Sequence, residues 1–323
     1  MWEFDRSGRY SHVWGDTILL AFVTTLRHPH NSHDYAGVER LLYESLSSIS
    51  QQTSDAYRIV IVGNRRPQFE LPPRTQFVEV DFDPPSQLAG PCTGLSPVIW
   101  DKGTKSGVAL AALRKTPPDF VMFFDADDFV HRNVAAHVDE NPDSPGWVVK
   151  RGYMYSPRRN AYVRRRRLHR ICGTSFIIPF GAYRVPECLD VDASQEAIAE
   201  AFGYDVLQRA LAGHRYQLNW WQDHGRTLQT LPFEGAVYRV ETGENHSGNR
   251  LLGPCRPYRQ HLLDDFAVRS SKPRAATWWS SIGGPAWRPD LRPRRPSFLR
   301  APQPVLHGPG PSGALAGPLG NTP

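Results

Sequence analysis

Three carboxylates stand almost side by side where an apolar run of the chain ends. Five apolar residues at 120–124 lead into Asp125, Ala126, Asp127 and Asp128. Like charges at this spacing repel, so an uncompensated trio would be costly. A divalent cation relieves the repulsion, and Mg²⁺ or Mn²⁺ favours one or two carboxylates together with phosphate oxygens and water. The segment therefore predicts a metal site; the alternative is a polar strand end whose solvated carboxylates cap the next helix.

The segments before this cluster alternate between strand and helix. Short apolar runs predict buried strands, and apolar residues at helical spacing predict the helices between them. The order strand, helix, strand, strand, helix, strand predicts an α/β fold with a mixed, mainly parallel sheet flanked by helices. Ligands of such sheets bind beyond the carboxyl ends of the strands. The predicted strands are 17–25, 58–64, 76–82 and 120–128, and the predicted helices are 35–52 and 102–115.

The second half of the chain is less regular. We expect strands at 146–155, 174–180 and 234–242, and a pair of helices within 197–214. These strands are expected to form a mixed sheet that continues the sheet of the first half.

The acidic segment and the helix before it resemble bacterial family 2 glycosyltransferases, which have the GT-A fold. In that family a strand ends in a DxD motif after a helix of basic and small residues, as Lys102-Gly103-Thr104-Lys105 begins one here. The resemblance covers about residues 17–250. It implies a GT-A-like, nucleotide-diphospho-sugar transferase fold and a metal-dependent hexosyltransferase. Such an enzyme moves a sugar from a nucleotide-sugar donor to a glycan or lipid-linked acceptor, as in polysaccharide biosynthesis.

The resemblance also implies roles for the acidic residues. Asp125, with Ala126 beside it, would contact the nucleoside of the donor, and Asp127, together with Asp128, would hold Mn²⁺ or Mg²⁺. The metal would bridge the diphosphate and neutralise the leaving nucleotide. In several GT-A enzymes a late histidine completes the metal site, and His246 is the candidate here because a neutral imidazole is a common ligand. The alternative is a structural histidine, and inversion or retention stays open.

Four further polar residues are candidates for binding the donor. Lys102 or Lys105 would contact the diphosphate, unless both simply begin a solvated helix. Thr24 ends the first predicted strand and is a candidate for the nucleoside pocket. The family often has an acidic residue after the second strand to read the base, whereas this chain has Asn64 followed by two arginines. Asn64 is therefore included, and the identity of the nucleotide stays open.

Small and aromatic residues in the second half are candidates for binding the acceptor. The segment Gly173, Thr174, Ser175 opens a predicted strand and resembles the acceptor-side segment of the family. Small side chains let a sugar ring approach the backbone, although a simple turn would read the same. Trp220 and Trp221 are adjacent and would suit a sugar platform, since ring faces pack on π faces; the alternative is a core position.

Two aspartates are candidates for the catalytic base. Inverting family 2 enzymes usually have a Glu-Asp pair at a helix start, and the segment at 204–213 resembles this pattern with Tyr204 in place of the glutamate. By analogy Asp205 would take the proton from the acceptor hydroxyl. The alternative is a helix-start aspartate that favours the macrodipole. Asp223, which follows the two tryptophans, is the rival base.

A long basic segment has no acidic residue. Residues 150–186 contain ten Lys or Arg, including the run Arg164 to Arg167. Like charges at this density are expected to form a mobile loop. Its function would be contact with an anionic acceptor or an anionic lipid surface, or closure over the donor diphosphate; a solvated loop is the alternative. No RNA-binding motif accompanies the charge, so nucleic acid is not an expected partner.

Composition sets the boundaries of the folded part. Residues 271–323 carry seven basic and one acidic side chain and 11 of the 29 prolines, so a disordered tail is predicted at 269–323. The expected organisation is an N-terminal extension (1–16) and one domain at 17–268, with a donor-binding half (17–130) and an acceptor half (131–268). The four cysteines are far apart, and no secretory signal or long apolar run is visible. These features predict a cytoplasmic protein, with peripheral contact at the inner face of an anionic membrane as an option.

Two other functions remain open. A sugar nucleotidyltransferase shares the α/β core, but it usually has a Gly-rich loop after the first strand, and residues 26–37 are not Gly-rich. A non-catalytic carbohydrate-binding protein on the same scaffold is opposed by the intact acidic cluster and the candidate bases.

Overall fold

The structure, a computed structural model, describes residues 2–4, 10–12, 19–90, 95–244 and 248–281. Most of the predicted N-terminal extension lies outside these ranges. Its two described segments, β1 (Trp2–Phe4) and β2 (Tyr10–His12), pair antiparallel.

The main sheet has seven strands and is mixed, mainly parallel, which confirms the predicted fold class. Only β11 runs against its neighbours: it is antiparallel to both β6 and β8, whereas the other described pairings in this sheet are parallel. The first half contributes four parallel strands whose carboxyl ends meet at one edge, as the alternating pattern predicted. The order across the sheet is β12 (Gln229–Thr230), β8 (Trp147–Val148), β11 (Phe176–Pro179), β6 (Phe120–Phe123), β3 (Leu20–Thr25), β4 (Tyr57–Gly63), β5 (Thr75–Glu79).

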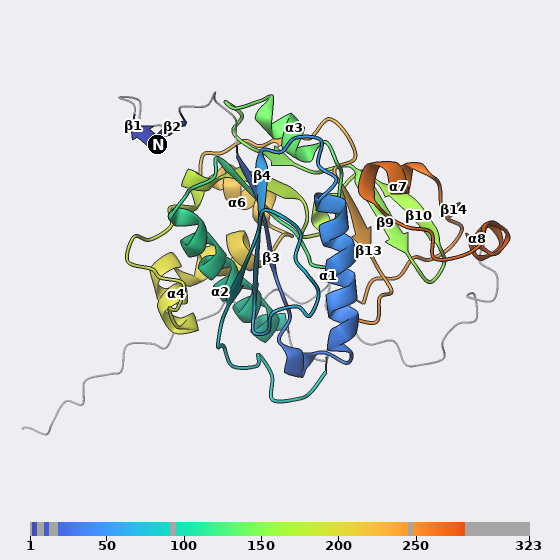
Figure 1. Cartoon of the computed structure of the whole chain (residues 1–323), viewed down its shortest axis with the longest axis horizontal. Coiled ribbons are helices and arrows are strands. Elements are labelled where there is room, and N and C mark those ends of the chain that lie inside the picture. Colours follow the sequence, from blue (N-terminus) through green and yellow to red (C-terminus); the bar gives the residue numbers. More distant parts are fainter. Residues whose placement is uncertain (1, 5–9, 13–18, 91–94, 245–247, 282–323) are drawn as a thin grey trace, which may run out of the picture.

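Two long helices cover opposite faces of this sheet (Figure 1). In β3, Leu20 and Phe22 pack into the core shared with α1 (Tyr35–Ile49), and the alternate residues Ala21 and Val23 pack into the core shared with α2 (Leu95–Arg114). A strand buried on both faces reads as a continuous apolar run. Helix α2 starts seven residues before its predicted start, because Pro97 is tolerated in a first helical turn.

A second sheet corrects the expectation of one continuous sheet. The predicted strand 146–155 divides at 149–151, so that β8 stays in the main sheet while β9 (Gly152–Ser156) enters the second. The second sheet packs through Met154, Ala161 and Tyr238 into the core that contains α1. Its strand order is β14 (Arg256–Pro257), β10 (Ala161–Arg165), β9, β13 (Ala236–Arg239), β7 (Phe129–Val130).

The basic segment is also ordered, contrary to the predicted mobile loop. β9 and β10 form an antiparallel hairpin, in which Arg164 pairs with Glu234. Apolar side chains of this hairpin, such as Met154 and Ala161, are buried, and their burial offsets the repulsion among the arginines that point outward.

The helices of the second half confirm the predicted pair within 197–214. Helix α4 (Gln195–Phe202) begins at Ser194, whose hydroxyl accepts a hydrogen bond from Ala197 N at 3.2 Å. After Gly203 the chain continues as α5 (Tyr204–Val206) and a π-helical turn, η4 (Leu207–Ala212). The remaining helical elements are η1 (Pro29–Asn31), α3 (Val134–Asp139), η2 (Leu168–Arg170), η3 (Phe180–Tyr183), α6 (Gln217–Asp223), α7 (His261–Phe266) and α8 (Arg274–Ser281).

The folded part extends past the predicted boundary at residue 268. Arg159, buried at the hairpin turn, donates from Nε to Ser280 O at 3.2 Å and from Nη2 to Ser281 O at 2.9 Å. Asn160 donates to the Thr277 hydroxyl at 2.6 Å. Helix α8 therefore packs on the second sheet, and the predicted tail from 282 onward lies outside the described residues. Within the part of the chain that is described, no helix combines the length and apolar character needed to cross a bilayer.

Candidate active site

The acidic segment turns sharply at the carboxyl edge of the main sheet. Phe124 N still donates to Val23 O at 2.9 Å, and Asp128 N then closes a turn on Asp125 O at 2.9 Å. Ala126 lies inside this turn, and its carbonyl accepts from the Ser45 hydroxyl of α1 at 3.0 Å. The turn therefore presents three carboxylates that β6 and α1 hold in place.

Asp128 faces inward and joins three segments of the chain. Its Oδ2 accepts from the Thr174 hydroxyl at 2.7 Å and from Cys172 Sγ at 3.1 Å, and its Oδ1 accepts from Arg239 N at 3.1 Å. The side chain is fully buried. Burial, with Asp127 and Asp125 adding to it, raises the pKa of this carboxyl well above its usual value. These contacts argue against the predicted role of Asp128 as a metal ligand.

Asp125 is held in an ion pair. Lys102 Nζ lies 2.5 Å from its Oδ1, and Gly173 N donates to its Oδ2 at 3.2 Å. Burial acts against the charged form, but Lys102, with smaller contributions from His214 and the Gly173 N–H, lowers the pKa of Asp125 overall. A Cβ at Gly173 would lie 2.6 Å from Asp125 Oδ2, so the position requires a glycine. Thr174 completes the link, since its hydroxyl accepts from Asp125 N at 3.0 Å.

Asp127 is a partly exposed carboxyl of the turn, and its pKa is raised. Burial and then Asp125 raise its pKa to about 6, while Arg239 and Arg27 oppose the rise. Arg239 also bonds Glu44, and Arg27 bonds Glu244 Oε2 at 2.6 Å, so both cations are shared with other acids. A carboxylate under such repulsion would gain from a divalent cation.

The described residues fit a metal that depends on its substrate for ligands. Among them, no group of three or more His, Cys, Asp or Glu side chains is placed to hold an ion. Mg²⁺ and Mn²⁺ commonly use one or two carboxylates plus substrate phosphates and water, which Asp127 with Asp125 can provide. The third predicted ligand, His246, lies outside the described residues.

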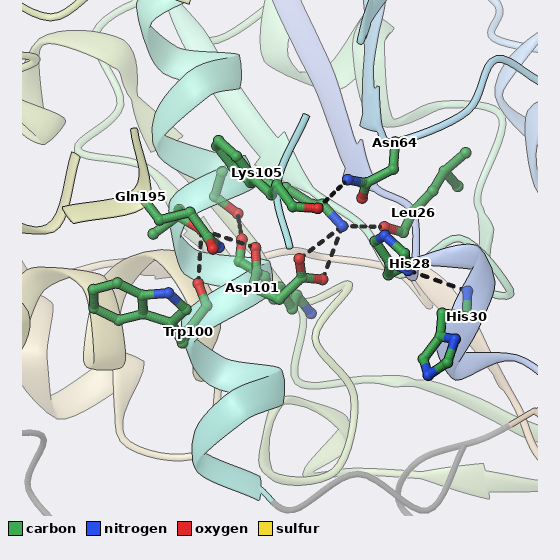
Figure 2. Close-up of polar contacts among 12 residues, drawn as sticks. Leu26, His28, His30, Asn64, Trp100, Asp101, Lys105 and Gln195 are labelled. Atoms are coloured by element: carbon green, nitrogen blue, oxygen red, sulfur yellow. Dashed lines mark hydrogen bonds and ion pairs between the residues drawn. The ribbon is translucent and has the colours of Figure 1, made fainter. Parts of the chain in front are cut away.

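Lys105 takes a structural place and not the predicted place at the diphosphate. It is fully buried, and its Nζ donates to Leu26 O and to Asp101 Oδ2, each at 2.9 Å. Figure 2 shows the ammonium group between Leu26 and Asp101, at the centre of a polar network on α2. Burial lowers the pKa of Lys105, and Asp101 opposes this. Lys102, one turn earlier, is therefore the lysine that reaches the acidic turn.

The predicted nucleoside residues lie in the same region as this network. Asn64 donates from Nδ2 to Phe82 O at 2.8 Å, while its buried Oδ1 has no hydrogen-bond partner among the described residues. His28 accepts from His30 N at 3.1 Å, and burial followed by the charge of Lys105 lowers its pKa (Figure 2). Thr24 is only 1% exposed, so it lies behind this surface and is not placed to touch a ligand.

The acceptor-side candidates separate into two groups. Gly173 and Thr174 form hydrogen bonds with the acidic turn. Ser175 is fully buried, and its carbonyl accepts a hydrogen bond from Val149 N at 2.8 Å. Trp221 is a core residue that packs edge-on against Tyr183, with ring centroids 5.4 Å apart. Trp220 stays partly exposed, and its ring lies tilted against that of His224, with centroids 3.8 Å apart.

Neither predicted base has a hydrogen bond or ion pair to the acidic turn within the described residues. Asp205 is 58% exposed and pairs with Arg209 at 2.7 Å along its own helix. Asp223 is exposed at the end of α6.

His214 was missed by the sequence reasoning. It follows the π-helical turn η4 and is partly exposed, and it lies close enough to Asp125 and Lys102 for their charges to act on its pKa. Burial is the main reason that its pKa is lowered to about 4; Asp125 opposes this, and Lys102 adds to it. No local motif marks this histidine. The only sequence signal is its position after Gly213, where a helix was predicted to end.

Comparisons with known proteins give similarity in fold only. The chain matches no protein-family model and no curated protein sequence. Among solved structures it is similar to S. aureus TarS (14% identity, TM-score 0.38), with 69% of this chain matched and only 37% of the TarS chain spanned. It is also similar to a protein described as a nucleotide-diphospho-sugar transferase from Desulfovibrio desulfuricans G20 (9% identity, TM-score 0.33, covering 68% of this chain and 80% of that one). A third is Rv0371C of Mycobacterium tuberculosis H37Rv in complex with manganese (14% identity, TM-score 0.34, covering 69% and 91%).

Proposed function

We propose that this chain is a metal-dependent glycosyltransferase that uses a nucleotide-sugar donor. The observation that supports it best is the acidic turn itself, at which Asp127 lies beside the Asp125–Lys102 pair at the carboxyl edge of a mainly parallel sheet. Ligands of such sheets bind at this edge. The family resemblance of the sequence points to the same residues.

In this proposal the described residues divide the work of donor binding. Asp127, supported by Asp125, holds Mn²⁺ or Mg²⁺, and the ion would stabilise the negative charge of the departing nucleoside diphosphate. Lys102 balances Asp125 and leaves its ammonium group at the turn, where an anionic diphosphate would be attracted. Gly173 has no side chain, and the carboxylate of Asp125 occupies the space that a Cβ would take. Asn64 and His28 line the adjacent region proposed for the nucleoside.

The base that accepts the proton from the acceptor hydroxyl is proposed among three residues. Asp205 is a candidate because of the family pattern, and Asp223 because it follows the two tryptophans. His214 is a candidate because it lies close enough to Asp125 for that carboxylate to act on its pKa. A base needs to lie near the reacting hydroxyl. The base is identified by assaying donor binding and sugar transfer in three variants, Asp205→Asn, Asp223→Asn and His214→Gln. The variant that lacks the base keeps donor binding and loses transfer.

The first test is a thermal-shift panel of UDP, GDP, CDP and dTDP, each with Mn²⁺ or with EDTA. A ligand that binds the native state at ~100-fold excess over Kd adds roughly 2.7 kcal/mol of stability. We expect a shift with one nucleotide that disappears in EDTA and in Asp127→Asn. Asp55→Asn is the matched control, since this exposed aspartate pairs with Arg74 and lies outside the acidic turn, and we expect it to keep the shift.

The panel also separates the alternative functions. A shift that is insensitive to EDTA and to Asp127→Asn would contradict the metal site. The four matching nucleoside triphosphates are added to the panel, and a shift with a triphosphate and not with its diphosphate would favour a sugar nucleotidyltransferase. No shift with any nucleotide would favour a non-catalytic carbohydrate-binding protein.

A further inference from the structure

Two neighbouring grooves on the surface, here called the arginine grooves, are rich in basic side chains: arginines are six of the nine residues that line the first, and three arginines and one lysine are among the seven that line the second. The first groove has a volume of about 510 Å³, and its charged lining residues are Arg164 to Arg167, Arg170 and Arg250. The second groove, of about 560 Å³, shares Arg164 and Arg166 with the first and adds Lys150 and Arg151. No acidic residue lines either groove, so the described walls of both are cationic or neutral.

Most of these charges have no acidic partner among the residues that the structure describes. Arg164 pairs with Glu234, but in the described part of the chain no ion pair engages Arg166, Arg167, Arg170 or Arg250, and all four are exposed. Guanidinium groups gathered around one hollow repel each other, and an anion relieves that repulsion. The positive charge also acts on the neighbouring His169. Burial is the main cause that lowers its pKa to about 4, and Lys150, Arg170 and Arg167 add to it.

The fold holds five of these arginines on two regular elements and on the two-residue link, 166–167, between β10 and η2. Arg164 and Arg165 belong to strand β10, and η2 carries Arg170. Between them Leu168 is fully buried, and its N donates to Lys150 O at 2.9 Å, which fastens the wall of both grooves to the segment that links β8 and β9. A site on ordered elements keeps its geometry better than one on a loose loop.

The first groove adjoins the acidic turn. Ile171 lines the groove, the next residue Cys172 donates to Asp128, and Gly173 donates to Asp125. Two residues of extended chain span at most ~7 Å, so the groove and the turn are close neighbours. Asn249, which also lines the first groove, provides a second link: it donates to the Tyr238 hydroxyl at 3.1 Å, and the next residue, Arg239, donates from its N to Asp128.

We propose that the two arginine grooves bind an acceptor chain that carries phosphate or phosphodiester groups, and lead its hydroxyl to the acidic turn. Arginine binds phosphate oxygens through two parallel N–H donors and stays charged at all relevant pH values. Two grooves that share Arg164 and Arg166 offer space for more than one phosphate along a chain. A recessed groove suits such a chain better than a flat lipid surface. The proposal rests on the proposed sugar transfer, and it names the substrate class of the acceptor.

The test measures binding of inorganic tripolyphosphate by calorimetry, in EDTA so that no metal is present at the acidic turn. We compare the wild-type chain with the double variant Arg166→Gln/Arg167→Gln. The control is Arg158→Gln/Arg259→Gln, which removes the same charge from two exposed arginines outside the grooves. Loss of two charge-assisted contacts is expected to weaken binding roughly tenfold or more. The control is expected to bind as the wild type does, and the groove variant to keep its melting temperature and its nucleotide shift with Mn²⁺.

Three results would overturn the proposal. Equal loss in both double variants would show that tripolyphosphate follows net charge and not the grooves. No binding of tripolyphosphate, together with groove-dependent binding to vesicles of phosphatidylcholine and phosphatidylglycerol, would assign the arginines to a membrane surface. Groove-dependent binding of tripolyphosphate in a protein that shifts with no nucleotide would leave an anion site but remove its acceptor role, which separates this failure from failure of the proposed function.

Discussion

At the scale of single residues, the acidic turn shows how one sequence pattern holds side chains with different tasks. Asp125 is balanced by Lys102, Asp128 is buried among hydrogen-bond donors, and Asp127 is left with a raised pKa. The pattern DADD predicted that carboxylates meet at the sheet edge. It did not predict which one turns inward, because this depends on Thr174 and Arg239, which are distant in sequence.

Asp127 is expected to destabilise the metal-free protein. Its folded pKa of about 6 lies above the usual value of 3.8, so the folded state binds more protons between these pH values and stability falls as pH rises through this window. Above pH 6 the full cost is present. Because the side chain is partly exposed and screened, we expect Asp127→Asn to raise the free energy of unfolding by about 1–2 kcal/mol at pH 7.

The measurement is denaturant unfolding of both proteins in EDTA at pH 4 and pH 7. The difference between wild type and Asp127→Asn should be small at pH 4, where Asp127 is mostly protonated, and larger at pH 7. A variant that is less stable than wild type at pH 7 would show that the ionised carboxylate makes favourable contacts that outweigh the repulsion. A stabilised variant that no longer responds to Mn²⁺ would mean that Asp127 is retained at the expense of stability.

At the scale of elements, the sequence predicts regular segments well and their partners poorly. The apolar runs of β3, β4 and β6 and the helical spacing of α1 are local signals, and the structure confirms all four. The division of 146–155 into β8 and β9 falls at Lys150 and Arg151, but this local break does not show that the two pieces join different sheets. Which sheet each joins is decided by pairing with β11 and β13, far along the chain. His214 was missed because its nearness to Asp125 also depends on parts of the chain that are far apart in sequence.

Gly152 is the residue at which β9 enters the second sheet. A Cβ there would clash with the Ala236 carbonyl of β13 and with the side chain of Leu168. We therefore expect Gly152→Ala to lower the free energy of unfolding by about 1–3 kcal/mol, as overpacking of a core does. Gly181→Ala is the control, because its added Cβ would meet nothing within 4 Å. The measurement is thermal unfolding of both variants, compared with the wild type. Equal stability of the two variants would mean that β9 and β13 shift apart at little cost.

At the scale of the whole molecule, the composition of the C-terminal part gave the wrong boundary. Residues 269–281 are rich in small and polar residues, and composition placed them with the proline-rich segment that follows. The structure uses them as hydrogen-bond acceptors for Arg159 and Asn160, which are buried at the turn of the β9–β10 hairpin. That hairpin carries the arginine grooves, so the C-terminal helix α8 supports a surface that it does not itself form.

A chain cut after residue 268 should therefore lose stability, whereas a chain cut after Ser281 should not. Without α8, the buried guanidinium of Arg159 loses the carbonyls of Ser280 and Ser281, and unsatisfied donors of this kind cost about 2–4 kcal/mol in total. The melting temperatures of chains 1–268, 1–281 and 1–323 measure this directly. Arg159→Met provides a second readout: it should cost less in chain 1–268 than in chain 1–323, because truncation has already removed the contacts to Ser280 and Ser281 and leaves only those from Nη1 to Leu251 O and Cys255 Sγ. Additive losses would mean that α8 stabilises the molecule through other contacts, and an unchanged melting temperature for chain 1–268 would restore the boundary at residue 268.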